Sequence, residues 1–222
     1  MNPKTALMLG GSGLVGRFCL QALLEDPTYE RVISVARHEL AIATHPKLMQ
    51  KIIEFDALSS LTLPQLDDVF CALGTTIRKA GSQEAFRRID LELPLTAAKQ
   101  ALKFGARQFF LVSSVGADPK SKNFYLGTKG ELEQALASLL FKAVHIFRPS
   151  LLLGDRDESR PGESFAIVAA KIFQFLCVGP LRRYHPISAM HVGRAMVAAS
   201  KAGRQGANVY EYNEIVAMSA QR

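Results

Sequence analysis

The feature that most constrains the fold is an alternation of short apolar runs with helical patterns, which continues to residue 148. Each run is apolar almost throughout, as a strand must be when both of its faces are buried. The runs cover Thr5–Leu9, Arg31–Val35, Lys51–Phe55, Asp68–Leu73, Gln108–Ser113 and Ala143–Phe147. Runs of this kind predict the strands of one parallel sheet.

Between the runs, apolar side chains recur at the spacing of one helix face. Such stripes occupy Leu14–Leu24, Leu91–Leu102 and Leu132–Leu140. A chain that alternates strands with helices places its helices on both faces of a parallel sheet. We therefore predict an α/β fold with a Rossmann-like, doubly wound parallel sheet.

After residue 148 the pattern changes. A charged loop, Asp155–Glu163, precedes two helix candidates, Ser164–Cys177 and Ala189–Lys201, and the short run Asn208–Tyr212 is a candidate edge strand. Roughly 70 residues are few for an independent domain. We expect one domain over residues 1–222, with residues 150–222 forming a small cap on the substrate side. The charged loop is either a lid that responds to ligand or a static turn.

The chain has 27 Lys and Arg residues against 20 Asp and Glu residues, a net charge of +7. No basic run is longer than two and no zinc-finger spacing occurs, so nucleic acid is not an expected partner. A distributed positive charge instead favours an anionic small ligand. The histidines, carboxylates and three cysteines show no metal-site spacing, and we expect no metal.

The longest apolar stretch, residues 166–178, is shorter than the roughly 20 residues that a membrane-spanning helix needs. The apolar segment before the first glycines is too short for the core of a signal peptide. Three cysteines without a pairing pattern favour a reducing compartment. These features predict a cytoplasmic protein that does not enter a membrane, and they leave its oligomeric state open.

A glycine triplet, Gly10, Gly13 and Gly16, follows the first predicted strand and opens the first predicted helix. In this context the first glycine permits a tight turn, the second lets the backbone approach a pyrophosphate, and the third lets the helix pack closely on the strand. Phosphates would bind at the positive end of that helix. The alternative is a structural turn that is rich in glycine.

The end of the second strand predicts which dinucleotide binds. Arg37 stands where an acidic residue would hold the ribose of NAD, and a guanidinium favours the 2′-phosphate of NADP(H). Asp56 follows the third strand, where it would accept from the adenine amino group or simply cap a helix. Leu73, Gly74 and Thr75 end the fourth strand, where small residues would let the cofactor cross.

Candidate catalytic residues follow the fifth strand. Tyr125 and Lys129 are four residues apart, on one face of a predicted helix. An ammonium group beside a phenol stabilises the phenolate, which can exchange a proton with a carbonyl or alcohol oxygen. Ser113 or Ser114, at the end of the strand, would hold the same oxygen. A bare YxxxK pattern is common, but here it follows a Ser-Ser strand end and a glycine triplet.

In combination, these motifs resemble the atypical short-chain dehydrogenases/reductases. Further segments are similar to the Tat-interacting-protein (CC3) branch of that family: Cys71–Thr76, Phe109–Asp118, Asn123–Lys129, Phe147–Ser150 and Asp155–Glu163. The resemblance covers about residue 4 to about residue 200. It implies a Rossmann fold that binds NADPH, with Ser113, Tyr125 and Lys129 as the catalytic set. The asparagine that many members use for proton relay has no clear counterpart, and Asp90 lies in that helix.

The predicted cofactor-binding residues are Gly10, Ser12, Gly13, Leu14, Val15, Gly16, Arg37, Asp56, Leu73, Gly74, Thr75, Tyr125, Lys129 and Pro149. Two functions fit this set. The first is an NADP(H)-dependent oxidoreductase acting on a small carbonyl or alcohol substrate. The second is a regulatory or sensor protein that binds NADPH without turnover. A hydrolase is disfavoured, because no GxSxG elbow occurs.

Overall fold

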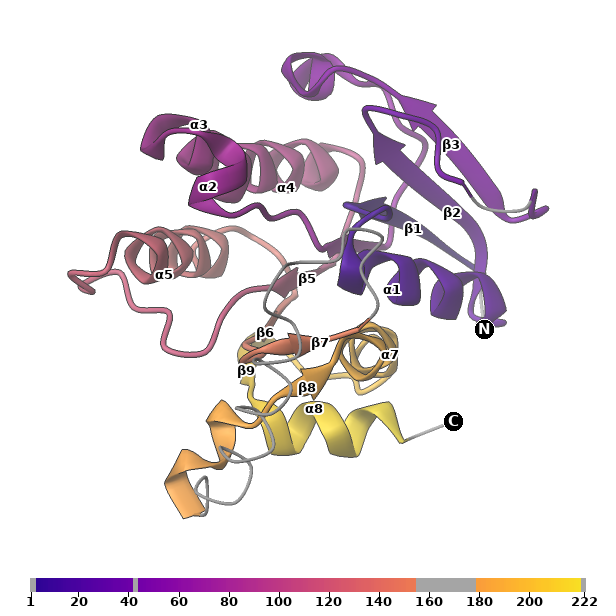
Figure 1. Cartoon of the computed structure of the whole chain (residues 1–222). Helices are drawn as coiled ribbons and strands as arrows, with labels where there is room; N and C mark the ends of the chain where they lie inside the picture. Colours follow the sequence, from indigo (N-terminus) through magenta and orange to yellow (C-terminus); the bar gives the residue numbers. More distant parts are fainter. Residues whose placement is uncertain (1–2, 42–43, 155–178, 221–222) are drawn as a thin grey trace.

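The computed structural model describes residues 3–41, 44–154 and 179–220. Its centre is a parallel sheet of seven strands in the order β3-β2-β1-β4-β5-β6-β9 (Figure 1). The strands are β1 (Lys4–Leu9), β2 (Tyr29–Ala36), β3 (Leu48–Ile52), β4 (Asp68–Cys71), β5 (Gln108–Val112), β6 (Ala143–Phe147) and β9 (Gly206–Tyr210). The chain moves outward from β1 first in one direction and then in the other, which confirms the doubly wound sheet.

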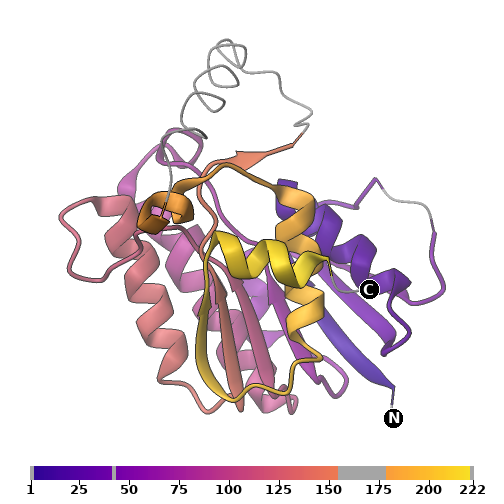
Figure 2. The ribbon, with the colours of Figure 1, turned by 90° about the horizontal axis from the view of Figure 1, so that it is seen from below.

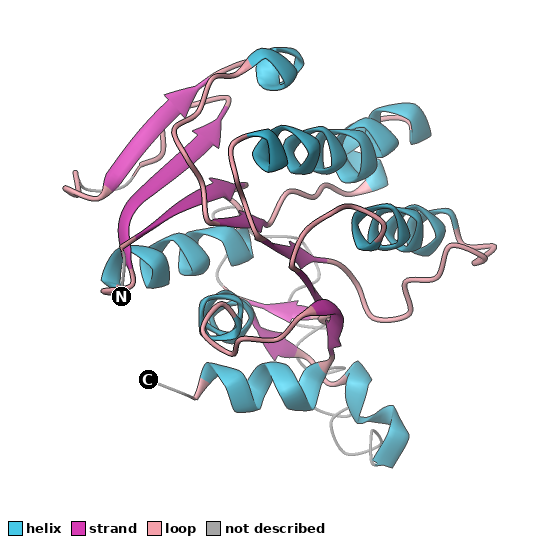
Figure 3. Cartoon of the chain, turned by 180° about the vertical axis from the view of Figure 1, so that it is seen from behind, coloured by secondary structure: helices cyan, strands magenta, loops and turns pink. Residues whose placement is uncertain are grey.

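Helices cover both faces of this sheet (Figures 1 and 3). The helices are α1 (Leu14–Glu25), α2 (Ile77–Ala80), α3 (Gln83–Arg87), α4 (Leu93–Lys103), α5 (Phe124–Ala137), α7 (Ala189–Ala199) and α8 (Tyr212–Ser219). Shorter turns are the 3-10 helices Phe55–Ser60 and Gly179–Tyr184 and a π-helical turn, Arg88–Glu92. Helices α1, α7 and α8 lie on one face, and α4 and α5 lie on the other.

Alternate residues of each strand supply the two cores. In β1, Ala6 and Met8 pack towards α1 and α7, whereas Leu7 and Leu9 pack towards α4 and α5. All four are at most 1% exposed. Burying one such leucine contributes about 1.5–3 kcal/mol, so both faces of the strand must be apolar. This is the physical reason for the continuous apolar runs in the sequence.

One strand lies earlier than the sequence predicts. We expected Lys51–Phe55, but β3 is Leu48–Ile52, with Leu48 paired to Val32 of β2. The strand forms the edge of the sheet and none of its residues is buried, so its register follows β2 and not its own apolar residues. The chain then turns at Phe55 into a 3-10 helix.

Some of the described residues after 150 extend and cover the main sheet, and others form a small separate pair of strands. β9 joins the main sheet, and α7 and α8 cover the face of that sheet that is nearer to the viewer in Figure 2. Two short strands, β7 (Leu152–Leu153) and β8 (Ile187–Ser188), pair separately from it. The division into a main unit and a cap stays a prediction, and the charged loop 155–163 and the helix candidate 164–177 lie outside the described residues.

Within the described ranges, no helix combines the length and the apolar character that crossing a bilayer requires. In the same ranges, no group of three or more His, Cys, Asp or Glu side chains is arranged to hold a metal ion.

Candidate active site

A pocket of about 590 Å³ lies where the order of the strands reverses, at the carboxyl ends of β1, β4 and β5. Ligands of open α/β sheets bind at such a point. Its described lining consists of Ser12, Gly13, Leu14, Val15, Arg17, Ala72, Leu73, Gly74, Thr75, Thr76, Lys79, Asp90, Val112, Ser113, Tyr125, Lys129 and Leu152. Residues from the glycine turn, the fourth strand end and the YxxxK helix therefore meet in one cavity.

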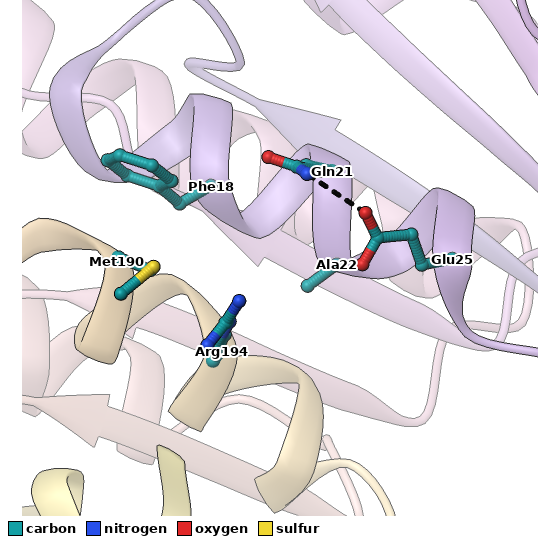
Figure 4. A pocket seen from close by; sticks show the side chains of 6 residues that line it. All are labelled: Phe18, Gln21, Ala22, Glu25, Met190 and Arg194. Carbon is teal, nitrogen blue, oxygen red and sulfur yellow. Dashed lines mark hydrogen bonds between the residues drawn. The ribbon is translucent and has the colours of Figure 1, made fainter. Parts of the chain in front are cut away.

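A second hollow, of about 110 Å³, lies between α1 and α7 (Figure 4). Phe18 and Met190 face it together with Arg194, and the Nε2 atom of Gln21 donates to Oε1 of Glu25 along its edge. The hollow is several times smaller than the site pocket and contains none of the predicted site residues.

The glycine turn needs glycine at two positions. Gly10 has a φ of +79°, and a Cβ there would lie 2.7 Å from the carbonyl of Ala72. A Cβ on Gly16 would lie 1.9 Å from the carbonyl oxygen of Gly10. The turn therefore approaches both β4 and its own helix more closely than any side chain permits. Helix α1 begins directly after Gly13, so its positive end borders the pocket.

The predicted catalytic residues meet at the other side of the pocket. Helix α5 is capped by Asn123, whose side chain accepts from the N–H of Leu126 across 3.1 Å. This cap sets the first turn, and Tyr125 and Lys129 then share the helix face that lines the pocket. Ser113 follows β5 and lines the same pocket. Ser114, the alternative serine, is not among the described lining residues.

Lys129 forms a buried ion pair with Asp90. Its Nζ lies 2.8 Å from Oδ1 of Asp90, and the two side chains are 5% and 0% exposed. The second carboxylate oxygen accepts from the backbone N–H of Thr75, also across 2.8 Å. Burial lowers the pKa of Lys129, but the negative charges of Asp90 and then Tyr125 together raise it by more. The net pKa therefore lies above its ordinary value. Lys129 is therefore an ammonium group at neutral pH.

Ser113 also has an internal partner. Its Oγ donates to Glu133, which lies one turn beyond Lys129 on α5. Arg148, just after β6, forms an ion pair with the same carboxylate. Two acidic residues are thus bonded to predicted catalytic side chains: Asp90, which lines the pocket, and Glu133, which is not in the described lining.

Other predicted cofactor residues lie outside the described lining of the pocket. Gly10 and Gly16 form the turn beneath it, and the buried Pro149 accepts through its carbonyl from the N–H of Val115 across 3.0 Å. Arg37 directly follows β2, is exposed, and has its guanidinium 5.4 Å from the ring centre of Phe55.

Asp56 does not face the pocket in this structure. We expected it to accept from an adenine group or to cap a helix. Its side chain is instead 77% exposed and forms an ion pair with Arg88. It stands in the first turn of a 3-10 helix without a capping hydrogen bond from Glu54, the residue at the cap position.

Several residues in the pocket, or bonded to its lining, have no role in the sequence prediction. Asp90 lines the pocket, and Glu133, which accepts from Ser113, continues the spacing of Tyr125 and Lys129 along α5. Arg17, directly after the last glycine, and Lys79 place two further cations in the lining. The sequence signal for Asp90 and Glu133 is a charged residue among the apolar positions of a helix.

No family model matches the sequence, but curated relatives do. The chain is 38% identical to Protein HTATIP2 of Rattus norvegicus over 170 residues, which cover 75% of this chain and 70% of the relative. It is 34% identical over 215 residues to "Protein FMP52, mitochondrial" of Lodderomyces elongisporus, covering 91% and 89% of the two chains.

Solved structures share the fold at low sequence identity. MoeE5 in complex with UDP-glucuronic acid and NAD aligns with a TM-score of 0.68 at 16% identity, over 98% of this chain and 81% of MoeE5. The human epimerase family protein SDR39U1 with NADPH aligns with a TM-score of 0.63 at 18% identity, over 93% and 74%.

The parallel sheet and the glycine turn define a protein with a Rossmann-like α/β fold. Within that class, the chain belongs to the family of HTATIP2 and FMP52. The family resemblance seen in the sequence is thereby confirmed.

The expectation of a cytoplasmic protein is wrong by the same comparison. Relatives from Lodderomyces elongisporus, Coccidioides immitis and Emericella nidulans are all named as mitochondrial proteins. The expectation rested on three unpaired cysteines and on the absence of a signal-peptide core. Unpaired cysteines favour a reducing compartment in general and do not specify which one.

Proposed function

We propose that the protein binds NADP(H) in the pocket and transfers hydride between the cofactor and a small carbonyl or alcohol compound. The observation that carries this proposal is the meeting of Ser113, Tyr125 and Lys129 with the glycine turn in one cavity. Solved structures with a similar fold support a nicotinamide cofactor, since MoeE5 is described with NAD and SDR39U1 with NADPH.

The residues present fit such a cofactor. The turn at Gly10 and Gly16 leaves no room for side chains, so a pyrophosphate can approach the backbone at the start of α1. The exposed Arg37 would hold the 2′-phosphate, and Asp56, in the 3-10 helix that follows β3, would accept from the adenine amino group. Leu73, Gly74 and Thr75, together with Pro149, would border the nicotinamide half, and Ser12, Gly13, Leu14 and Val15 the phosphates.

The bound nicotinamide would supply or accept the hydride. Tyr125 would donate a proton to the carbonyl oxygen in reduction, or accept it in oxidation. Lys129 has three N–H donors, of which Asp90 uses one, so the others can contact the cofactor ribose and Tyr125. Ser113 would contact the reacting oxygen and position it.

A second function is favoured by one specific observation. Lys129 and Ser113 already have internal partners in Asp90 and Glu133, as expected for side chains with a structural role. In that case the protein would be an NADPH-binding regulator or sensor without turnover.

A turnover screen separates the two. A panel of aldehydes, ketones and sugars is incubated with NADPH and the protein, and the loss of NADPH absorbance is followed. The oxidoreductase proposal requires turnover that Tyr125→Phe reduces about 10²- to 10⁴-fold without weakening NADPH binding. Tight NADPH binding, with the same rate of NADPH loss in the wild type and in Tyr125→Phe, would favour the sensor.

A further inference from the structure

The hydroxyl proton of Ser113 is directed into the protein and away from the pocket. Ser113 Oγ donates to Oε1 of Glu133 across 2.5 Å, and the two residues are 5% and 6% exposed. Glu133 follows Lys129 by four residues, so Tyr125, Lys129 and Glu133 form one polar stripe along α5. Glu133 is therefore connected to the pocket by its hydrogen bond to Ser113, which lines it.

Arg148 keeps Glu133 as an acceptor. Its Nε donates to Oε1 and Oε2 across 3.0 and 3.2 Å, and its Nη2 donates to Oε2 across 2.5 Å. The hydrogen bonds to Glu133 raise the pKa of Arg148 above its ordinary value. A guanidinium has donors only, so both oxygens of Glu133 face N–H groups and the side chain is a carboxylate.

A serine hydroxyl has one proton and two acceptor positions. With its proton bonded to a carboxylate, Ser113 presents only acceptor positions to the pocket. The hydroxyl of an alcohol can donate to it directly. A carbonyl oxygen carries no proton, and it could bind Ser113 only by drawing the serine proton away from a charge-assisted hydrogen bond.

We propose that Glu133, fixed by Arg148, is a positioning residue that holds Ser113 as a hydrogen-bond acceptor. The pocket consequently binds the alcohol form of a ligand more tightly than the carbonyl form. This inference rests on the proposed function, because it assigns a ligand preference to the same site.

The test measures binding and needs no turnover. The protein is first saturated with a tetrahydronicotinamide analogue of NADPH, which cannot transfer hydride. Cyclohexanol and cyclohexanone are then titrated by calorimetry, and the ratio of the ketone Kd to the alcohol Kd is compared between variants. In the wild type this ratio should be at least about tenfold, as expected for loss of a charge-assisted hydrogen bond.

Glu133→Gln is the decisive variant. The amide N–H can donate to Ser113, which frees the serine proton for a carbonyl oxygen, so the ratio should fall by about tenfold or more. Ser113→Ala removes the acceptor and leaves Glu133 and Arg148 in place, and its ratio should approach one. This second variant keeps the test valid if Glu133→Gln does not fold.

Glu131→Gln is the matched control. Glu131 lies on the same helix and forms a similar fork with Arg87, at 3.2 and 2.7 Å, but Arg87, unlike Ser113, is not part of the described pocket lining. Its ratio should equal that of the wild type.

Three results would overturn the inference: a wild-type ratio near one, equal ratios in the wild type and both test variants, or failure of both compounds to bind. If the cofactor analogue itself does not bind, the proposed function fails, and this inference fails with it. The two failures are therefore distinguishable.

Discussion

The two ends of the central sheet both contain buried charged side chains, but they differ in what surrounds them. At the amino ends, Asp68 accepts from Lys4, Tyr29 and Gln108 at 2.7–2.9 Å. From this amino-end network the bonds continue from Gln108 through His145, in the middle of β6, to the hydroxyl of Tyr210, the last residue of β9. At the carboxyl ends, Asp90 and Glu133 bond to Lys129 and Ser113, which line a pocket of about 590 Å³.

The difference indicates what each group of residues contributes. The amino-end network joins six strands and none of its members lines the pocket, so its hydrogen bonds serve the fold. A buried ion pair such as Asp90–Lys129 adds little net stability relative to an apolar pair of the same size. Its place beside a cavity instead suits a role in binding or reaction.

The largest expected effect comes from the same substitution at both ends. Asp90→Asn leaves the buried Lys129 ammonium without its carboxylate and should cost about 3–5 kcal/mol of unfolding free energy. Asp68→Asn should cost less, about 1–3 kcal/mol, because Lys4 is 28% exposed and can turn to water. Urea denaturation measures both values.

NADPH binding provides the second readout for this pair of variants. Asp68→Asn should bind the cofactor as the wild type does, whereas Asp90→Asn should bind it more weakly. If Asp68→Asn and Asp90→Asn lose the same unfolding free energy and bind NADPH equally well, the two ends of the sheet do not differ in their contribution to binding.

The amino-end network should make stability depend on pH. Burial lowers the pKa of His145 to about 4, from 6.5 in a solvated histidine. The unfolded chain therefore binds a proton that the folded chain does not, and stability is lost as pH falls through this window. The loss should be about 3 kcal/mol between about pH 7 and pH 4.

Chemical denaturation at a series of pH values checks this. His145→Gln has no imidazole and should lose this part of the pH dependence, while NADPH binding at neutral pH stays unchanged. If the unfolding free energy of His145→Gln changes with pH as it does in the wild type, other titratable groups cause the pH dependence.

A smaller effect is expected at the pocket end. Arg37→Ala should reduce the preference for NADPH over NADH by about ten- to a hundredfold, since a charge-assisted contact contributes about 1.5–3 kcal/mol. Arg31→Ala, which removes an exposed arginine from β2, the strand that Arg37 follows, is the control. Calorimetric affinities that keep their ratio in Arg37→Ala would remove the basis for NADP(H) specificity.

The sequence predicts the sheet well because most strands are buried on both faces and must be apolar throughout. It places β3 incorrectly because an edge strand with no buried residue takes its register from its neighbour. The glycine turn and the Tyr125–Lys129 spacing are local patterns, so they can be read directly. The contacts of Asp90 with Lys129 and of Glu133 with Ser113 join different elements and depend on how the helices pack.

The most direct test of the central claim follows the hydride itself. NADPH doubly deuterated at C4 of its nicotinamide ring is incubated with the protein and the carbonyl panel, and the products are analysed by mass spectrometry. The account predicts an alcohol product that carries one deuterium on the former carbonyl carbon, and at least about a hundredfold less of it with Tyr125→Phe. A cofactor that binds tightly but keeps all of its deuterium with every compound would contradict hydride transfer.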